Sequence, residues 1–314
     1  MTLEQLRIFV AVAEFEHVTR AARHLNLTQS ATSAAVAALE TRYATKLFDR
    51  VGRRIALTES GRLFLVEARA VLARATAAET VLADLAGLAR GSLRIFSSQT
   101  VGNYWLPALI NQFRAAHPGI TLRLSLGNTE GVAAAVLDGA AELGFIEGGI
   151  DDPALVSQPI AVDHLVLVAP RSHPWTRTAP VSAADFSDAR WVCRERGSGT
   201  RTAHEAALLA LGLGSEALSG ALELPSNEAI CAAVEAGAGV TVLSSLVVRR
   251  ASQAGSLSAI DINLPTRRFF LLRHRERYLT QASAAFQKLV TTVADSDPRN
   301  SAPAVQGAIF KLSV

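Results

Sequence analysis

VTRAARHLNLTQSATSAAVAALETR, residues 18–42, is the stretch that decides the fold. Its apolar residues recur at helical spacing in two groups: Val18, Ala21, Ala22 and Leu25, then Val36 and Leu39. Between the groups, Asn26-Leu27-Thr28 has the length of a turn, and Thr28 is a favourable N-cap for the helix that follows. The stretch therefore predicts two short helices joined by a tight turn, as in a helix-turn-helix.

Short polar side chains mark the predicted outer face of the second helix: Gln29, Ser30, Thr32 and Ser33. Such side chains near a helix N-terminus can approach a phosphate or a base edge closely. An ordinary three-helix bundle with a solvated face would show the same pattern. The helix-turn-helix alone leaves both interpretations open.

The segment after these helices favours nucleic acid. Leu47-Phe48-Asp49-Arg50 leads into Val51-Gly52-Arg53-Arg54 and then Ile55–Thr58. A glycine-centred turn between short apolar segments predicts a β-wing, and Arg53 and Arg54 suit backbone phosphates or the minor groove. Residues 1–58 carry eight Lys/Arg against five Asp/Glu, a surplus of three that equals the net charge of the whole chain, +3.

A long helix is predicted over residues 59–88, within a linker of residues 59–90. Its apolar residues follow one another at alternating steps of four and three: Phe64, Ala68, Val71, Ala75, Ala78, Leu82 and Leu85. Such a heptad seam is typical of helices that pair, so we expect dimerisation through this segment. The alternative is an amphipathic helix that packs on its own domain.

Strands alternate with helices from Ser92 onward, which predicts an α/β domain over residues 91–295 with a parallel, doubly wound sheet. The expected strands are Leu93–Phe96, Thr121–Leu126, Leu143–Ile146, Leu165–Ala169, Trp191–Arg194, Leu222–Leu224, Val240–Leu243 and Phe269–Arg273. Residues 296–314 are expected to form a loosely structured tail.

Polar clusters follow several of these strands, where helix N-termini should offer free N–H groups. The clusters are Ser97-Ser98-Gln99-Thr100, Asn128-Thr129-Glu130-Gly131, Gly197-Ser198-Gly199-Thr200-Arg201 and Ser226-Asn227. Each alone is typical of a capped turn. Four at equivalent points favour a compact site for an anion or carboxylate. Glu130 and Glu147 count against an anion, and Arg201 is either a ligand or a solvated surface charge.

The order of these motifs resembles the LysR-type transcriptional regulators over nearly the whole chain. The similarity lies in Leu6-Arg7-Ile8-Phe9, Ala21-Ala22, Leu27-Thr28-Gln29-Ser30-Ala31, Ser33, Leu39-Glu40, Leu47-Phe48-Asp49-Arg50 and Leu57-Thr58-Glu59-Ser60-Gly61. Ser98–Pro107 and Gly197–Arg201 look most like the subgroup that includes regulators of carbon-fixation operons. One departure is alanine at both positions 34 and 35, where many members carry a polar residue; it points to fewer base contacts and more reading of DNA shape.

The resemblance implies an N-terminal winged helix-turn-helix (residues 1–58), a linker helix, and a two-lobed effector domain like periplasmic binding proteins. Lobe I would span about 91–161 and 267–295, and lobe II about 162–266. The expected partners are operator DNA, a small-molecule effector, further copies of the chain in a dimer and then a tetramer, and RNA polymerase as a further candidate. The implied DNA contacts come from Gln29, Ser30, Thr32, Ser33, Arg53 and Arg54, and the effector contacts from Ser98, Gln99, Thr100, Asn128, Thr129, Thr200 and Arg201.

Other classes of function fit less well. The sequence has no Walker motif, no His-Glu-x-x-His and no Gly-x-Ser-x-Gly, so we expect neither an enzyme nor a bound metal or cofactor. A cytoplasmic solute-binding module would not need the N-terminal helix-turn-helix segment. A regulator triggered by oxidation of Cys193, near Arg194 and Arg196, stays open beside the ligand-triggered one. No segment resembles a secretory signal or a membrane span, which predicts a cytoplasmic protein.

Overall fold

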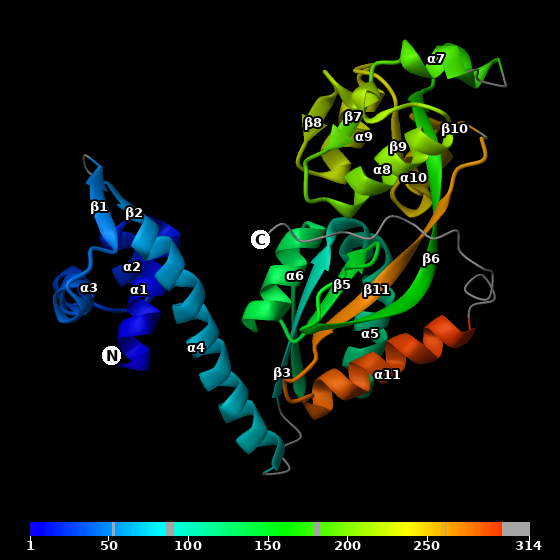
Figure 1. The fold of residues 1–314 in the computed structure, drawn as a ribbon. Coiled ribbons are helices and arrows are strands. Elements are labelled where there is room, and N and C mark those ends of the chain that lie inside the picture. The colour runs from blue at the N-terminus through cyan, green and yellow to red at the C-terminus, as the bar shows by residue number, and fades with distance from the viewer. Residues whose placement is uncertain (52–53, 86–90, 179–182, 261, 297–314) are drawn as a thin grey trace. The chain divides into compact units, whose positions relative to one another are not determined.

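The structure is a computed structural model that describes residues 1–51, 54–85, 91–178, 183–260 and 262–296. It contains two compact units, one within Met1–Gly87 and the other within Leu88–Leu137 and Ala141–Val314. The first unit, called the head here, holds α1 (Leu3–Phe15), α2 (Val18–His24), α3 (Gln29–Tyr43), β1 (Phe48–Val51), β2 (Arg54–Leu57) and α4 (Glu59–Leu85) (Figure 1).

Local hydrogen bonds define the helix-turn-helix of the head. Asn26 takes a left-handed backbone conformation (φ 56°) in the turn between α2 and α3. Thr28 Oγ1 then accepts a hydrogen bond from the Ala31 N–H at 3.2 Å and so caps α3. The predicted break between the two helices, with Thr28 as N-cap, is therefore confirmed.

The wing is an antiparallel pair, β1 with β2, tied to α3 by one carboxylate. Glu40 accepts hydrogen bonds from the N–H groups of Leu47 (2.8 Å) and Phe48 (3.2 Å). These bonds, together with Lys46, lower the pKa of Glu40 although its partial burial acts in the opposite direction. The carboxylate therefore stays charged and fixes the start of the wing to the end of α3.

Helix α4 is continuous, but its first turns belong to the core of the head. Phe64 lies 4.8 Å from Phe9 between ring centroids, and Ala68 is buried in the same cluster. Gly61 allows this approach, because a Cβ there would lie 2.1 Å from the Leu47 carbonyl oxygen. Phe64 and Ala68 thus cannot join the seam that the heptad spacing predicted, whereas Val71 and Leu82 farther along remain exposed.

The second unit contains one mixed sheet in the order β10-β6-β11-β5-β3-β4, with β9 also paired to β6, and a small parallel sheet of β7 and β8. Its strands are β3 (Gly91–Ser98), β4 (Ile120–Gly127), β5 (Leu143–Glu147), β6 (Leu155–Pro170), β7 (Val192–Arg194), β8 (Leu222–Leu224), β9 (Thr241–Ser244), β10 (Leu257–Ile260) and β11 (Thr266–His274). Its helices are η1 (Val101–Trp105), α5 (Leu106–Ala116), α6 (Thr129–Asp138), η2 (Pro174–Thr176), α7 (Ala183–Ser187), α8 (Gly199–Ala210), η3 (Ser215–Leu218), α9 (Asn227–Glu235), α10 (Ser245–Ala254) and α11 (Gln281–Ser296).

The expectation of a parallel, doubly wound sheet is wrong for four of these nine strands, β6, β9, β10 and β11. Strand β3 is parallel to β4 and β5, but β11 is antiparallel to β5 and β6, and β9 and β10 are antiparallel to β6. The cause is β6, whose 16 residues cross from one lobe to the other, as does the returning β11 (Figure 1). Only the segment Leu165–Ala169 of β6 was expected as a strand, and β10 was missed.

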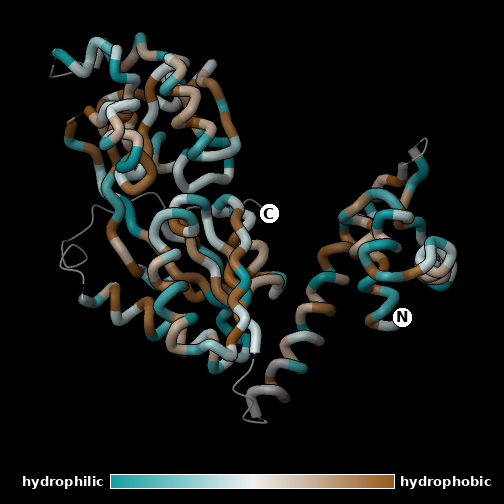
Figure 2. Tube along the Cα trace, turned by 180° about the vertical axis from the view of Figure 1, so that it is seen from behind, coloured by the Kyte–Doolittle hydropathy of each residue, from teal (hydrophilic) through white to brown (hydrophobic). Residues whose placement is uncertain are grey.

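Separate apolar cores divide the second unit into two lobes. Lobe I contains β3, β4, β5, α5, α6 and α11, with cores around Phe145, Phe286 and Val132. Lobe II contains β7 to β10 and α7 to α10, with cores around Trp191 and Ile230. Figure 2 shows brown, hydrophobic segments along the trace of both lobes. The long strands β6 and β11 connect the two lobes.

His204 on α8 is fully buried in the core of lobe II, with its ring 5.1 Å from that of Trp191. Burial, and to a smaller extent the charge of Arg201, lower the pKa of His204 to about 3. The folded chain therefore holds this imidazole neutral, whereas the unfolded chain binds a proton below the ordinary pKa of about 6.5.

This difference predicts a loss of stability on acidification. The contribution of His204 is fully present above pH 6.5 and is lost as the pH falls from there toward 3, about 1.4 kcal/mol at pH 5.5. Urea unfolding of lobe II, followed by tryptophan fluorescence at pH 7.5 and 5.5, measures it. His204→Leu should remove this part of the difference; an equal pH dependence in the variant would contradict the prediction.

Candidate functional sites

The N-terminal turns of α3 present three of the four predicted DNA-binding residues to solvent. Gln29, Ser30 and Ser33 are exposed, whereas Thr32 is fully buried and its hydroxyl donates a hydrogen bond to the Thr28 carbonyl oxygen at 3.0 Å. The expectation that Thr32 contacts DNA is therefore wrong, because its side chain is used inside the head. Of the two alanines noted above, only Ala34 is exposed.

A groove between α3 and the wing contains basic residues that sequence reasoning did not single out. Ser33 and Ala37 line it from α3, and Lys46 and Arg50 line it from the wing side. Arg54 is the first residue of β2, and Arg53 lies outside the described residues. The exposed hydroxyl of Ser33 thus shares this groove with two cationic side chains and with the carboxylates of Asp49 and Glu40, the second of which pairs with Lys46.

In the second unit, the predicted hydroxyl residues gather where the two lobes meet. Ser98 ends β3, Thr129 starts α6 and Thr200 belongs to the first turn of α8, and all are at most 3% exposed. The hydroxyl oxygens of Thr100 and Thr200, from opposite lobes, lie 3.4 Å apart. The structure therefore places predicted residues from distant parts of the sequence side by side.

A buried guanidinium, which sequence reasoning missed, lies among these hydroxyls. Arg267 is 5% exposed, and its Nη1 donates to the Gly199 carbonyl oxygen at 3.2 Å and to Thr200 Oγ1 at 3.4 Å. Its Nη2 lies 3.5 Å from Thr100 Oγ1. We call Ser98, Thr100, Thr129, Thr200 and Arg267 the cleft cluster.

Asp163 neutralises Arg267 from the neighbouring strand. Arg267 on β11 and Asp163 on β6 are register partners, and Nε of the guanidinium donates to the Asp163 carboxylate at 2.7 Å. The same carboxylate accepts a hydrogen bond from Ser244 at 2.6 Å. A buried charge needs such a partner, because removing it from water is otherwise costly.

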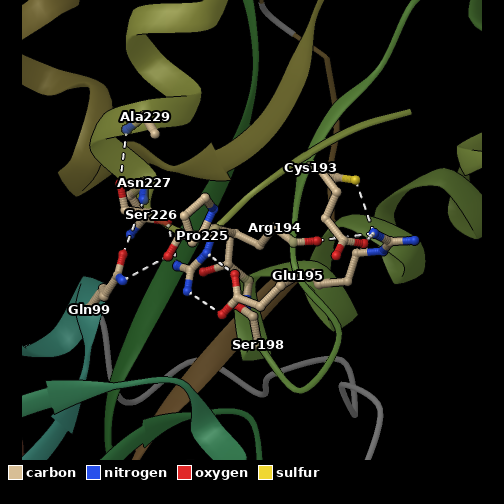
Figure 3. Close-up of polar contacts among 12 residues, drawn as sticks. Gln99, Cys193, Arg194, Glu195, Ser198, Pro225, Ser226, Asn227 and Ala229 are labelled. Carbon is tan, nitrogen blue, oxygen red and sulfur yellow. Dashed lines mark hydrogen bonds and ion pairs between the residues drawn. The ribbon is translucent and has the colours of Figure 1, made fainter. Parts of the chain in front are cut away.

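Further hydrogen bonds join the lobes around the cleft cluster. Gln99 of lobe I donates to the Pro225 carbonyl oxygen and accepts from the Asn227 N–H, both at 3.1 Å (Figure 3). Asn227 also donates to Thr100 Oγ1 at 3.1 Å, and Gly199 N–H donates to Thr129 Oγ1 at 3.1 Å. These contacts close the cleft over the cluster.

Two predicted effector residues lie in other networks. Arg201 forms ion pairs with Glu205 (2.7 Å) and Glu223 (3.3 Å), and its Nη1 is 2.9 Å from Cys193 Sγ. Two carboxylates of lobe II therefore already pair with Arg201, and its contact with an effector stays a prediction. Asn128 accepts a hydrogen bond from the Gly131 N–H at 2.9 Å and so caps α6.

The cysteines do not favour the oxidation-triggered alternative. Burial raises the pKa of Cys193, which is 1% exposed, and this effect outweighs the opposing charge of Arg201. Burial and the charges of two glutamates raise the pKa of Cys231 to about 11. Because the thiolate is the species that reacts with oxidants, protonated thiols of this kind are poor sensors. Within the described residues, no three His, Cys, Asp or Glu side chains form a metal site, and no helix is long and apolar enough to span a membrane.

Two protein-family models match this chain: "Bacterial regulatory helix-turn-helix protein, lysR family" over residues 3–62, and "LysR substrate binding domain" over residues 86–295. The chain is 38% identical to the HTH-type transcriptional regulator YeiE of Escherichia coli K12, over 91% of this chain and 96% of that one. It is 33% identical to the RuBisCO operon transcriptional regulator of Allochromatium vinosum, over 94% and 97%.

Among solved structures, the regulatory domain of Synechocystis PCC6803 CcmR in complex with 2-PG is similar to the second unit. The TM-score is 0.57 at 26% identity, and the match covers 66% of this chain and 99% of that one.

The ion pair at the centre of the cleft gives a test of this geometry. Asp163→Asn should lower the free energy of unfolding by about 3–5 kcal/mol, because Arg267 would stay buried without its counterion. Chemical unfolding of the full chain measures the loss. Asp163→Leu combined with Arg267→Met removes both charges and should lose less than Asp163→Asn alone. A double variant that is less stable than the single one would contradict the assignment.

Proposed function

The chain belongs to the LysR family of bacterial transcription regulators, and from this we propose that a small anion, bound between lobes I and II, controls its binding to operator DNA. The family membership makes the chain a DNA-binding regulator with an effector-binding domain. The nature of the effector and the residues that hold it are the proposal.

The observation that carries the anion proposal is the buried guanidinium among hydroxyls from both lobes. Arg267 Nη2 has two long contacts, at 3.5 Å from Thr100 Oγ1 and 4.0 Å from the Glu147 carboxylate. The hydroxyl of Ser98 is 2% exposed and has no hydrogen-bond partner there. Such groups are hydrogen-bond donors, and an anion accepts strong hydrogen bonds from them. The CcmR regulatory domain was solved with 2-PG, which supports a small-molecule effector at this kind of domain.

We assign DNA contacts to Gln29, Ser30 and Ser33 on α3 and to Arg53 and Arg54 on the wing, in a DNA-binding domain of residues 1–58. Lys46 and Arg50 join this set because they line the groove beside Ser33. Short hydroxyl and amide side chains on α3 suit base edges in the major groove, whereas the cationic residues suit phosphates. Thr32 is left out.

We also propose that the exposed part of α4 pairs with a second copy of the chain, in a dimer that assembles further into a tetramer. Val71 and Leu82 are 41% and 69% exposed, although both lie on the apolar seam. A long helix with exposed apolar residues at heptad positions gains stability when a partner helix covers them. Ala68 is excluded from this surface by its burial in the head, and the partly buried Phe64 packs against the same cluster.

Adjacent residues on α3 give a matched test of the DNA contacts. Ser33→Ala should cost about 1–3 kcal/mol of operator affinity and leave binding to random DNA nearly unchanged. Thr32→Val should leave operator affinity unchanged and lower the melting temperature, because it removes a buried hydrogen bond. Fluorescence anisotropy and thermal melting measure both. Equal affinity losses in the two variants would contradict the assignment.

The effector proposal is tested by calorimetry of the full chain with a panel of small anions that includes phosphate, sulfate, short carboxylates and 2-PG. Thr100→Val nearly keeps the side-chain shape but removes a hydroxyl of the cleft cluster, and should cost about 1–2 kcal/mol of anion affinity. Thr202→Val on the same α8 helix, outside the cluster, is the control and should bind normally. The proposal fails if no anion of the panel binds, or if Thr100→Val and Thr200→Val both bind like the natural chain.

A further inference from the structure

A second carboxylate lies against the cleft cluster and has few hydrogen bonds of its own. Glu147 ends β5 and is 3% exposed. Its Oε2 is 3.5 Å from Thr129 Oγ1, and its Oε1 is 4.0 Å from Arg267 Nη2. Both distances exceed the 2.7–2.9 Å that is usual for a charge-assisted hydrogen bond. Among the described contacts, this carboxylate is therefore weakly satisfied.

Arg267 has a closer ion-pair partner than Glu147. The short 2.7 Å ion pair to Asp163 compensates Arg267, so Glu147 adds a further negative charge to a buried site. An ionised carboxylate offers acceptors and no donor. A ligand that presents only acceptor oxygens would repel the Glu147 carboxylate and leave it without a hydrogen-bond donor. A hydroxyl or N–H on the ligand would instead donate a hydrogen bond to this carboxylate.

Glu147 also lies where lobe II closes over lobe I. A Cβ on Gly199, the first residue of α8, would lie 2.7 Å from Thr129 Oγ1 and 3.1 Å from the Cβ of Glu147. The first residue of α8 thus packs against the backbone and Cβ of Glu147. Glu147 thus lies beside Arg267 and Thr129, within reach of a molecule that these residues and Thr200 would hold.

We propose that Glu147 determines specificity by selecting anions that carry a hydrogen-bond donor beside their negative charge. The guanidinium of Arg267 and the hydroxyls of Ser98 and Thr100 hold the anionic oxygens, and Glu147 accepts the ligand's O–H. The effector class is then a hydroxy acid or a protonated oxyanion. Fully deprotonated anions of the same shape are disfavoured, because a buried polar group discriminates strongly against a ligand that leaves it unpaired. This inference rests on the proposed function, in which the cleft binds a small anion.

Matched pairs of anions test it on the full chain by calorimetry at pH 7.5: phosphate with sulfate, glycolate with acetate, and lactate with propionate. Within the pairs that bind, the member with a donor should bind at least about tenfold more tightly to the natural chain. Glu147→Gln should lower this ratio of affinities severalfold. The main cause should be tighter binding of the anion without a donor, since an amide can donate as well as accept a hydrogen bond. Glu130→Gln, at an exposed carboxylate in the first turn of α6, should keep the ratio of the natural chain.

The outcomes separate this inference from the proposed function. If both members of each pair bind equally to the natural chain, or the donor-free member binds more tightly, the role of Glu147 is overturned while the anion site stands. An unchanged ratio in a folded Glu147→Gln protein overturns it as well. If no anion of the panel or the pairs binds to the natural chain, the proposed function fails and this inference with it. The comparison within the natural chain does not depend on whether a variant folds.

Discussion

The need to compensate a buried guanidinium organises the space between the two lobes. Arg267 lies on β11, which crosses between the lobes beside β6, and its charge is met by its register partner Asp163. Its remaining donors reach Thr100 of lobe I and Thr200 of lobe II. An unpaired buried charge costs several kcal/mol, so the segment after β3 and the start of α8 are held in position by one side chain.

The contacts that close the lobes are numerous but individually weak. Gln99, Asn227 and Thr129 make neutral hydrogen bonds across the cleft, each worth about 1 kcal/mol. A ligand that replaces some of them and adds bonds to Arg267 changes the balance between arrangements of the lobes. Differential binding of this kind is what shifts a conformational equilibrium. The cleft is therefore suited to respond to a small molecule without a rearrangement of either core.

The sequence predicted the head, the linker helix and the hydroxyl residues of the cleft, because these depend on local patterns. Periodicity and caps define α2 and α3, and polar residues after strands mark helix N-termini. Arg267 could not be predicted, since it lies at the start of a strand without a motif and its partners are about 70 to 170 residues away. Thr32 was misassigned because a threonine can bond back to a carbonyl four residues earlier. The alternation of strands and helices in the sequence likewise does not indicate that β6 and β11 pair antiparallel.

The most direct measurement of the central claim is the distance between the lobes in the presence of an anion. Spin labels at Arg114→Cys on α5 and Leu209→Cys on α8, both exposed, in a Cys231→Ala background, report it by pulsed electron paramagnetic resonance. The account predicts that an anion shown by calorimetry to bind shifts the distance distribution, and that Arg267→Met abolishes the shift. An identical distribution with and without saturating anion would contradict the account.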